Sequence, residues 1–304
     1  MAGLWLLRHG YLPPNPERRF VGARDIALTE AGREQIRQAA RALLAECDAA
    51  NGLPPSAAAA TGQGRHVQTA VAEAAERGAL REGKTGQYGP CVPQHIICSD
   101  LGRCRESARL VQDVFRARGH AVDIFPDAGL REISLGLWEG LTIAEVEARW
   151  PGSHAARGAD MAGFVPPQGE SFAAVQARAM DCVARWQACY PGECLLLVSH
   201  AGVLRTLLCH WLALPLAEVM RVPQHYACRI WLPGKEFGGG RDFLQLALKA
   251  CVPHPPFPGL FAREDDRTRR MQACVRPCGP LVKELCRIWG RLAGKFSQDV
   301  VRLR

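Results

Sequence analysis

Two histidines occupy the same local setting at distant places in the chain. His9 follows the apolar run 4–7 by one residue, and His200 comes just after the apolar run 194–198. Such runs are typical of buried strands, and the carboxyl ends of parallel strands meet at one edge of a sheet. Imidazole can act as a nucleophile or carry a proton near neutral pH. The pair therefore favours a catalytic site at that edge.

Arginines accompany these histidines. Arg8 directly precedes His9, and Arg103 follows the predicted strand 95–99. A guanidinium group offers a planar fork of donors that fits phosphate better than a single ammonium does. One histidine after a strand is more often structural, but two of them beside arginines after strands are hard to explain by packing alone. The combination indicates a site for an anionic substrate.

Strand and helix patterns alternate along most of the chain. The predicted strands are 4–7, 95–99, 121–125, 194–198, 230–232 and 243–248, and the predicted helices are 29–46, 66–77, 101–118 and 203–214. This alternation predicts an α/β fold, a three-layer αβα sandwich with a mostly parallel central sheet.

The composition divides the chain into a main domain, an insertion and an extension. We expect the main domain over 1–250, interrupted by a Gly/Ala/Pro-rich insertion at 47–94 that is best explained as a surface loop. Because the insertion joins a helix to the next strand, it should emerge opposite the strand carboxyl ends. A proline-rich stretch opens the basic extension 251–304, in which apolar residues recur at helical spacing from 281 to 296. An amphipathic helix packed on its own domain is favoured there over membrane or partner docking.

Charge and cysteine content exclude several classes of protein. The net charge is +8, but the segment 262–304 holds eleven Lys/Arg against five Asp/Glu, so the main domain is nearly neutral and nucleic-acid binding is not expected. The 13 cysteines are scattered without a Cys-x-x-Cys pair, which indicates reduced thiols and no metal site. No apolar stretch is long enough to span a bilayer, and the first residues lack the pattern of an export signal. We expect a cytoplasmic protein.

An ordered series of motifs indicates one protein family. The chain resembles the histidine phosphatase superfamily, also called phosphoglycerate mutase-like. The resemblance runs from residue 4 to 248 apart from the insertion, and its motifs lie at 7–10, 19–22, 25–32, 99–108, 130–133, 136–142, 169–171 and 199–202. Each motif is weak alone, and their order is what makes the resemblance specific. It implies the same αβα fold and phosphomonoester hydrolysis without a cofactor or metal.

The resemblance also implies a role for each site residue. His9 would be the nucleophile that becomes phosphorylated, and Arg8, Arg103 and His200 would hold the phosphoryl oxygens. Glu132 would protonate the leaving group and then activate water. Asn15 and the backbone at Gly22 would add neutral hydrogen bonds to the substrate.

Neighbouring residues leave alternatives open. Glu139 is a rival for the acid, although its place in the Trp-Glu-Gly stretch favours Glu132. Arg105 is expected on another side of its helix, in a structural role. Tyr11-Leu12 follows the first His-Gly where the family often has Glu-Thr or Glu-Ser, which removes a hydroxyl near the phosphate.

The substrate is the least determined feature. The segments 19–32 and 136–142 look most like the α-ribazole-phosphate phosphatase branch of cobalamin synthesis, and 150–168 is a variable stretch suited to a lid. A phosphoglycerate-type mutase and a non-catalytic module that binds a phospho-ligand or a protein remain alternatives. The expected partner is a small phosphorylated substrate, and a monomer and a homodimer both stay open.

Overall fold

A five-stranded sheet forms the centre of the computed structural model, which describes residues 3–52 and 89–233. Its strands are β1 (Gly3–Arg8), β2 (His95–Cys98), β3 (Asp123–Pro126), β4 (Cys194–Ser199) and β5 (Arg229–Pro233). They lie in the order β3-β2-β4-β1-β5, and only β5 is antiparallel to its neighbour. The prediction of a mostly parallel sheet is confirmed. The predicted strand 243–248 and the helices at 66–77 and 281–296 lie outside the described residues.

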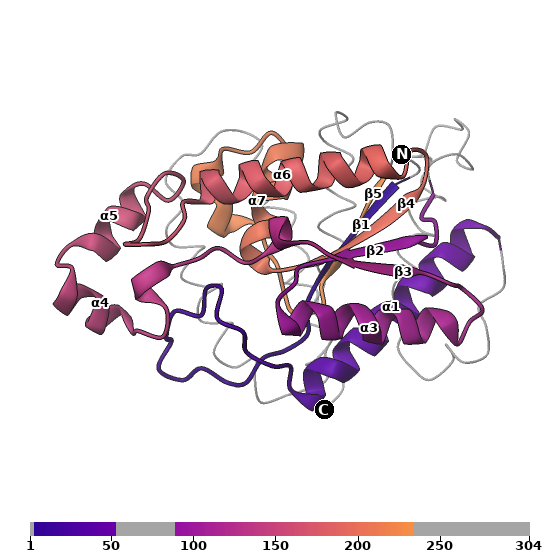
Figure 1. Ribbon diagram of the computed structural model, residues 1–304, viewed down its shortest axis with the longest axis horizontal. Helices are drawn as coiled ribbons and strands as arrows, with labels where there is room; N and C mark the ends of the chain where they lie inside the picture. The colour runs from indigo at the N-terminus through magenta and orange to yellow at the C-terminus, as the bar shows by residue number, and fades with distance from the viewer. Residues whose placement is uncertain (1–2, 53–88, 234–304) are drawn as a thin grey trace, which may run out of the picture. The chain divides into compact units, whose positions relative to one another are not determined.

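Helices cover both faces of this sheet (Figure 1). One face carries α1 (Glu30–Ala50) and α3 (Gly102–Arg116), and the other carries α6 (Phe172–Cys189) and α7 (Ala201–Trp211). The alternation of side chains along β1 explains the two layers: Leu4 and Leu6 join the core under α6 and α7, whereas Trp5 and Leu7 join the core under α1 and α3. The predicted three-layer αβα sandwich is confirmed.

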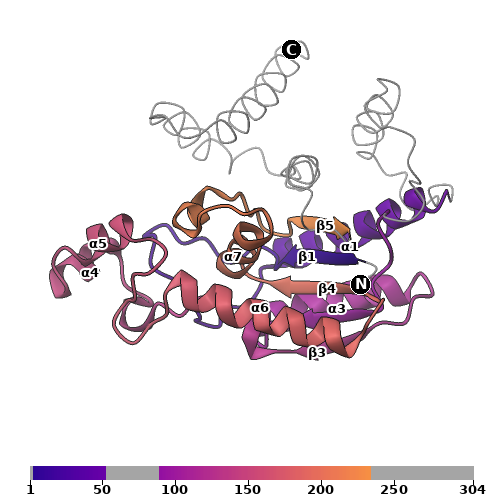
Figure 2. The same cartoon turned by 90° about the horizontal axis from the view of Figure 1, so that it is seen from above.

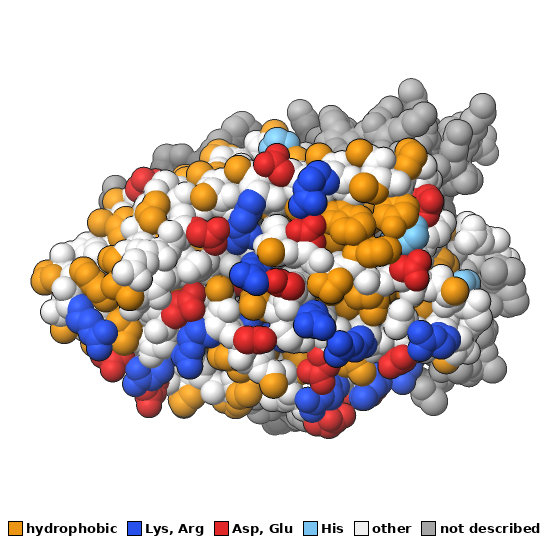
Figure 3. Space-filling view, in the orientation of Figure 1, with side chains coloured by type: hydrophobic (Ala, Val, Ile, Leu, Met, Phe, Trp, Pro, Cys, Tyr) orange, Lys and Arg blue, Asp and Glu red, His pale blue; other side chains and the backbone are white. Residues whose placement is uncertain are grey.

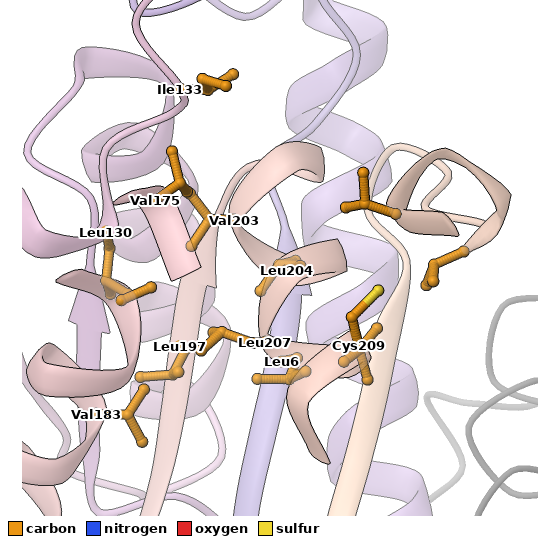
Figure 4. Close-up of a cluster of buried hydrophobic side chains, with 14 of the residues drawn as sticks. Leu6, Leu130, Ile133, Val175, Val183, Leu197, Val203, Leu204, Leu207 and Cys209 are labelled. Carbon is orange, nitrogen blue, oxygen red and sulfur yellow. The ribbon is translucent and has the colours of Figure 1, made fainter. Parts of the chain in front are cut away.

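Figure 4 shows part of the core between β1, β4 and α7. Leu6, Leu197, Leu204 and Leu207 are fully buried there. Each such side chain contributes about 1.5–3 kcal/mol by leaving water. This core fixes the ends of β1 and β4 relative to each other and so sets the spacing of the two histidines.

Helix α6 has no counterpart among the predicted elements. The Ser171 hydroxyl caps its first turn by accepting a hydrogen bond from the Ala174 N–H at 3.1 Å. Among its buried residues, Val175, Ala179 and Cys182 recur at three- and four-residue spacing. That spacing and the serine cap are the sequence signals that indicate the helix.

Two short helices form a cap beyond the edge of the sheet at which β1 ends (Figures 1 and 2). They are α4 (Ile143–Arg149), which begins with a Thr142–Glu145 capping box, and α5 (Ser153–Ala159). The stretch 150–168, expected to be a variable lid, thus holds one short helix. Three 3-10 helices complete the described elements: η3 (Ala128–Leu130), η4 (Gly136–Trp138) and η5 (Leu216–Arg221).

The described ends of the insertion lie close together. A Cβ built on Gly89 would lie 3.2 Å from the Ala50 Cβ at the end of α1. The Gln94 N–H donates to the Cys194 carbonyl at 3.0 Å, where β4 begins. These ends therefore lie at the edge of the sheet away from His9 and His200.

The face in Figure 3 carries basic and acidic side chains interspersed, without a large area of one sign. Ion pairs such as Arg33–Glu106 and Arg131–Asp100 connect neighbouring elements. This distribution agrees with a nearly neutral main domain.

Candidate active site

The ends of β1 and β4 bring His9 and His200 together. Arg8 pairs with Ser199 in the parallel ladder, and the His9 N–H donates to the Ser199 carbonyl at 3.1 Å. The two imidazole rings follow directly, with centroids 5.2 Å apart and planes inclined at 60°. His9 is 3% exposed and His200 is fully buried. Two side chains 191 positions apart in the sequence therefore lie side by side at the ends of β1 and β4.

Hydrogen bonding fixes the tautomer of His9. Its Nδ1 lies 2.8 Å from the Gly10 carbonyl oxygen, an acceptor, so Nδ1 carries the proton and Nε2 keeps its lone pair. Burial, followed by the charges of Arg8 and Arg103, holds the pKa of His9 well below its usual range. His9 is thus a neutral imidazole with Nε2 available as a nucleophile.

His200 is held neutral from several sides. The Arg103 Nε–H donates to its Nδ1 at 3.2 Å, so its Nε2–H donates to the Ser99 hydroxyl at 2.8 Å. The Cys104 thiol lies 3.4 Å from Nε2. Burial, then the neighbouring His9 and the arginines, keeps the pKa of His200 well below its usual range. The positive charge of this site therefore resides on the arginines.

Arg8 is held by the segment that precedes β5. Its Nη1 donates to the Gln224 carbonyl at 2.5 Å, and its guanidinium carbon lies 3.8 Å from the centroid of the Tyr226 ring. Burial lowers the pKa of Arg8, while Tyr226 and Glu132 oppose that shift. The stacked, planar guanidinium is well suited to a fixed anion contact.

Arg103, at the start of α3, is 1% exposed. Its Nη1 donates to the Arg24 carbonyl at 2.5 Å and its Nη2 to the Gly22 carbonyl at 3.2 Å. The Ser107 hydroxyl donates back to the Arg103 carbonyl at 2.7 Å, which secures the first turn of the helix. The guanidinium is thereby fixed between His200 and the loop after β1.

Gly22 supports Arg103 through its backbone. Its φ of +55° lies in the left-handed region, and a Cβ there would come within 2.2 Å of Glu139 Oε1. Sequence reasoning assigned Gly22 to the substrate, and the structure directs its carbonyl to Arg103.

The two rival acids occupy different settings. Glu132 accepts from the Ile133 N–H at 3.0 Å and from the Gly202 N–H at 3.2 Å, which sets its carboxylate against the start of α7. The charge of Glu132 acts on Arg8 and on the Cys104 thiol, which lies beside His200.

Glu139 instead joins two backbone segments. Its Oε1 accepts from the Ala23 and Leu135 N–H groups at 2.8 and 3.0 Å. These contacts tie the loop after β1 to the segment before η4, a structural arrangement.

Two other residues singled out in the sequence lie apart from this cluster. Asn15 is exposed, and its amide bonds twice to the Arg19 backbone, as donor at 2.7 Å and acceptor at 2.9 Å. It therefore closes its own loop. Arg105 is exposed on α3, away from the buried face that presents Arg103.

Sequence reasoning missed the aromatic side of the site. The Tyr226 ring lies 5.6 Å from the His9 ring and 5.2 Å from Tyr11, centroid to centroid. Tyr226 precedes β5 by only three residues, yet its contact with His9 depends on the antiparallel pairing of β5 with β1. The signal in the sequence was the position of a tyrosine just before a strand, which is too common to be specific.

The sequence profile of the histidine phosphatase superfamily (branch 1) matches residues 4–89 and 85–244. The chain belongs to the histidine phosphatase superfamily. The motifs at His9, Arg103, Glu132 and His200 lie within the matched residues, so the resemblance seen in the sequence is confirmed.

Several relatives illustrate the range of this superfamily. A bifunctional protein of Mycobacterium tuberculosis is 29% identical over 67% of this chain and 43% of its own length, so the chain spans less than half of that relative. The adenosylcobalamin/alpha-ribazole phosphatase of Salmonella typhimurium is 26% identical over 74% of this chain and 87% of its own. The solved structure of a mycobacterial glucosyl-3-phosphoglycerate phosphatase is 27% identical, with a TM-score of 0.54 over 77% of this chain and 90% of its own.

Within 3–52 and 89–233, no group of three or more His, Cys, Asp or Glu side chains is arranged to hold a metal ion. No helix in those same ranges is long and apolar enough to cross a membrane. The nine cysteines placed by the structure are all free thiols.

Proposed function

We propose that this chain hydrolyses phosphomonoesters through a phosphohistidine intermediate at His9. The observation that supports the proposal most directly is the tautomer of His9: Nδ1–H is bound to the Gly10 carbonyl, which leaves Nε2 as an uncharged nucleophile. Arg8 and Arg103 supply positive charge beside it. A neutral nucleophile next to fixed cations suits attack on a dianionic phosphate ester.

The first half-reaction transfers the phosphoryl group to His9. The Nε2 lone pair forms a bond to phosphorus while the bond from phosphorus to the ester oxygen breaks in line with it. Arg8 and Arg103 stabilise the charge on the three equatorial oxygens, and His200, held between Arg103 and Ser99, keeps the Arg103 guanidinium in place beside them. Glu132, as the proposed general acid, gives a proton to the departing oxygen, so the alcohol leaves neutral.

The second half-reaction returns His9 to its starting state. Glu132, now a carboxylate, takes a proton from water as the water oxygen bonds to phosphorus. The bond between Nε2 and phosphorus breaks, its electrons return to the imidazole, and inorganic phosphate leaves. Glu132 is again protonated, so the cycle consumes one ester and one water.

The substrate we put forward first is α-ribazole 5′-phosphate. The segments 19–32 and 136–142 carry this choice, and the relative from Salmonella typhimurium is named for that activity. A glucosyl-3-phosphoglycerate phosphatase and a probable phosphoglycerate mutase among the relatives make carboxylated phosphoesters the second candidate.

The decisive experiment is phosphate release without metal from a panel that contains α-ribazole 5′-phosphate, 3-phosphoglycerate, nucleotides and sugar phosphates. We expect His9→Ala to lower kcat by at least about 1,000-fold while inorganic phosphate still binds through the arginines. His210→Ala, at an exposed histidine on α7, is the matched control and should keep full activity. Alkaline quenching should also trap one phosphoryl group on the peptide that carries His9.

Two outcomes would contradict the proposal. Appreciable turnover by His9→Ala would remove His9 as the nucleophile. Conversion of 3-phosphoglycerate without net phosphate release, dependent on a bisphosphorylated primer, would identify a mutase instead.

A further inference from the structure

Arg157 in the cap is a cation without an anion. Its side chain is partly buried, and it forms no hydrogen bond or ion pair with any residue that the structure describes. Its recorded contact is with the ring of Phe172, whose centroid lies 5.6 Å from the guanidinium carbon. The ring face attracts the guanidinium but does not neutralise its charge. Burial lowers the pKa of Arg157, with no acidic neighbour to oppose the shift.

The acids of the cap are all engaged elsewhere. Glu145 accepts from Arg19 and from the Thr142 N–H. Glu147 accepts from two backbone N–H groups, at Gly152 and His154, and Asp160 from the N–H of Gly163. Because these carboxylates are bound to other groups, none of them neutralises Arg157.

Phe172 connects this cation to the site. It is the first residue of α6, and its Cε1 would lie 3.4 Å from a Cβ placed on Gly202. The Gly202 N–H binds Glu132, and Gly202 follows His200 by two residues. Arg157 therefore lies over a ring that packs against the peptide holding the proposed acid. Helix α5, which carries Arg157, lies on the side of the sheet where β1 and β4 end (Figure 1).

Glu132 also indicates where the leaving group must lie. If Glu132 protonates the departing oxygen, the leaving group lies on the side of phosphorus that faces Glu132, and the Gly202–Phe172 approach joins that carboxylate to the cap. Among the described cap residues, Arg157 is the partly buried cation without a hydrogen bond or ion pair, whereas Arg149 is exposed to solvent.

We propose that Arg157 binds a second anionic group, a carboxylate or a phosphate, on the leaving-group side of the substrate. This inference rests on the proposed function and narrows its substrate class. It reverses the order of the two substrate candidates given above, because a phosphorylated hydroxy acid has an anion on its leaving group and α-ribazole 5′-phosphate does not.

The test compares matched esters that differ in one charge. The first pair is 3-phosphoglycerate and glycerol 3-phosphate, which share the phosphoester and differ in the carboxylate. The second pair is fructose 1,6-bisphosphate and fructose 6-phosphate, which differ in a phosphate. The two pairs distinguish which anion Arg157 prefers.

We expect the wild type to favour the charged member of at least one pair by about tenfold or more in kcat/KM. Arg157→Met should remove that preference mainly through KM, with the uncharged member changed less than about twofold. Arg157→Lys should restore part of it, since the charge returns without the fork. Arg149→Met, which removes an exposed cation from α4, is the matched control and should keep the preference.

Loss of activity on both members of a pair alike, or a wild type without any charge preference, would overturn the role of Arg157. If no ester is turned over, the proposed function fails, and the inference is then judged by calorimetric binding of phosphoglycolate against ethyl phosphate. Tighter binding of phosphoglycolate that Arg157→Met abolishes would still support the site, and equal binding of the two would refute it.

Discussion

At the scale of single residues, the chemistry depends on which atoms carry protons. The Gly10 carbonyl sets the proton of His9 on Nδ1, and the Arg103 Nε–H sets the proton of His200 on Nε2. Hydrogen-bond partners also distinguish the two carboxylates. Glu132 lies against the start of α7, whereas Glu139 joins two backbone segments. Similar residues therefore differ in role because their hydrogen-bond partners differ.

The role of Glu132 as acid predicts a dependence on the leaving group. Glu132→Gln should slow alcohol release in a single turnover by about 100-fold for alkyl phosphates, which need protonation. Release of p-nitrophenol, a stable anion, should fall less than about fivefold. Rapid-quench measurement of the first turnover separates this step from hydrolysis of phosphohistidine.

Glu139→Gln is the control, because it makes the same change at a neighbouring acid bound to backbone N–H groups. It should show no difference between alkyl and aryl esters. An equal loss on both esters in Glu132→Gln would argue for an electrostatic or structural role of that carboxylate.

At the scale of elements, close approaches between strand ends and helix starts build the site. Helix α7 begins one residue after His200, and its second residue, Gly202, admits the Glu132 carboxylate. A Cβ on Gly202 would lie 2.3 Å from Glu132 Oε1, much closer than real contacts allow. Glycine is thus required at this position because Glu132 leaves no room for a Cβ, and not because of the backbone conformation of Gly202.

Gly202→Ala should therefore displace Glu132 and lower kcat by about tenfold or more, because a catalytic group that is moved by about 1 Å loses much of its effect. Gly158→Ala is the matched control, since a Cβ there meets nothing within 4 Å and the position is helical. It should leave phosphate release unchanged and raise stability slightly. Steady-state assays and thermal melts of both variants test this, and an active Gly202→Ala enzyme would contradict the placement of Glu132.

At the scale of the whole molecule, the layered fold buries two imidazoles beside arginines. His9 and His200 are neutral in the folded chain because burial and nearby positive charge hold their pKa values well below the usual range. In the unfolded chain each has a pKa of about 6.5. Below that pH the unfolded state binds more protons, so stability is greatest above about pH 6.5 and falls as the solution is acidified.

The free energy of unfolding should thus decrease between pH 6.5 and 5 with a slope of up to about 1.4 kcal/mol per pH unit for each histidine. His200→Asn should reduce the slope by about half, and His210→Asn, at an exposed site, should not change it. Urea titrations at several pH values measure these slopes. A slope in His200→Asn equal to that of the wild type would mean that His200 is not buried neutral.

The sequence by itself determined the family, the αβα layering and the residues His9, Arg103, Glu132 and His200 as candidates. Those residues lie in short motifs that follow strands. Strand patterns and strand-end motifs can both be recognised from a few consecutive residues. Parallel pairing then implies that they meet. Helix α6 carried a comparable signal in its cap and spacing and went unpredicted.

Only the tertiary structure decided which neighbours complete the site. Gln224 and Tyr226 reach Arg8 because β5 pairs with β1, and sequence spacing of more than 200 residues gives no register for such a contact. The turn of Asn15 onto its own loop and the unpaired charge of Arg157 likewise depend on which groups lie nearby after folding. Hydrogen-bond partners and burial are properties of packing, and packing is settled by the whole chain.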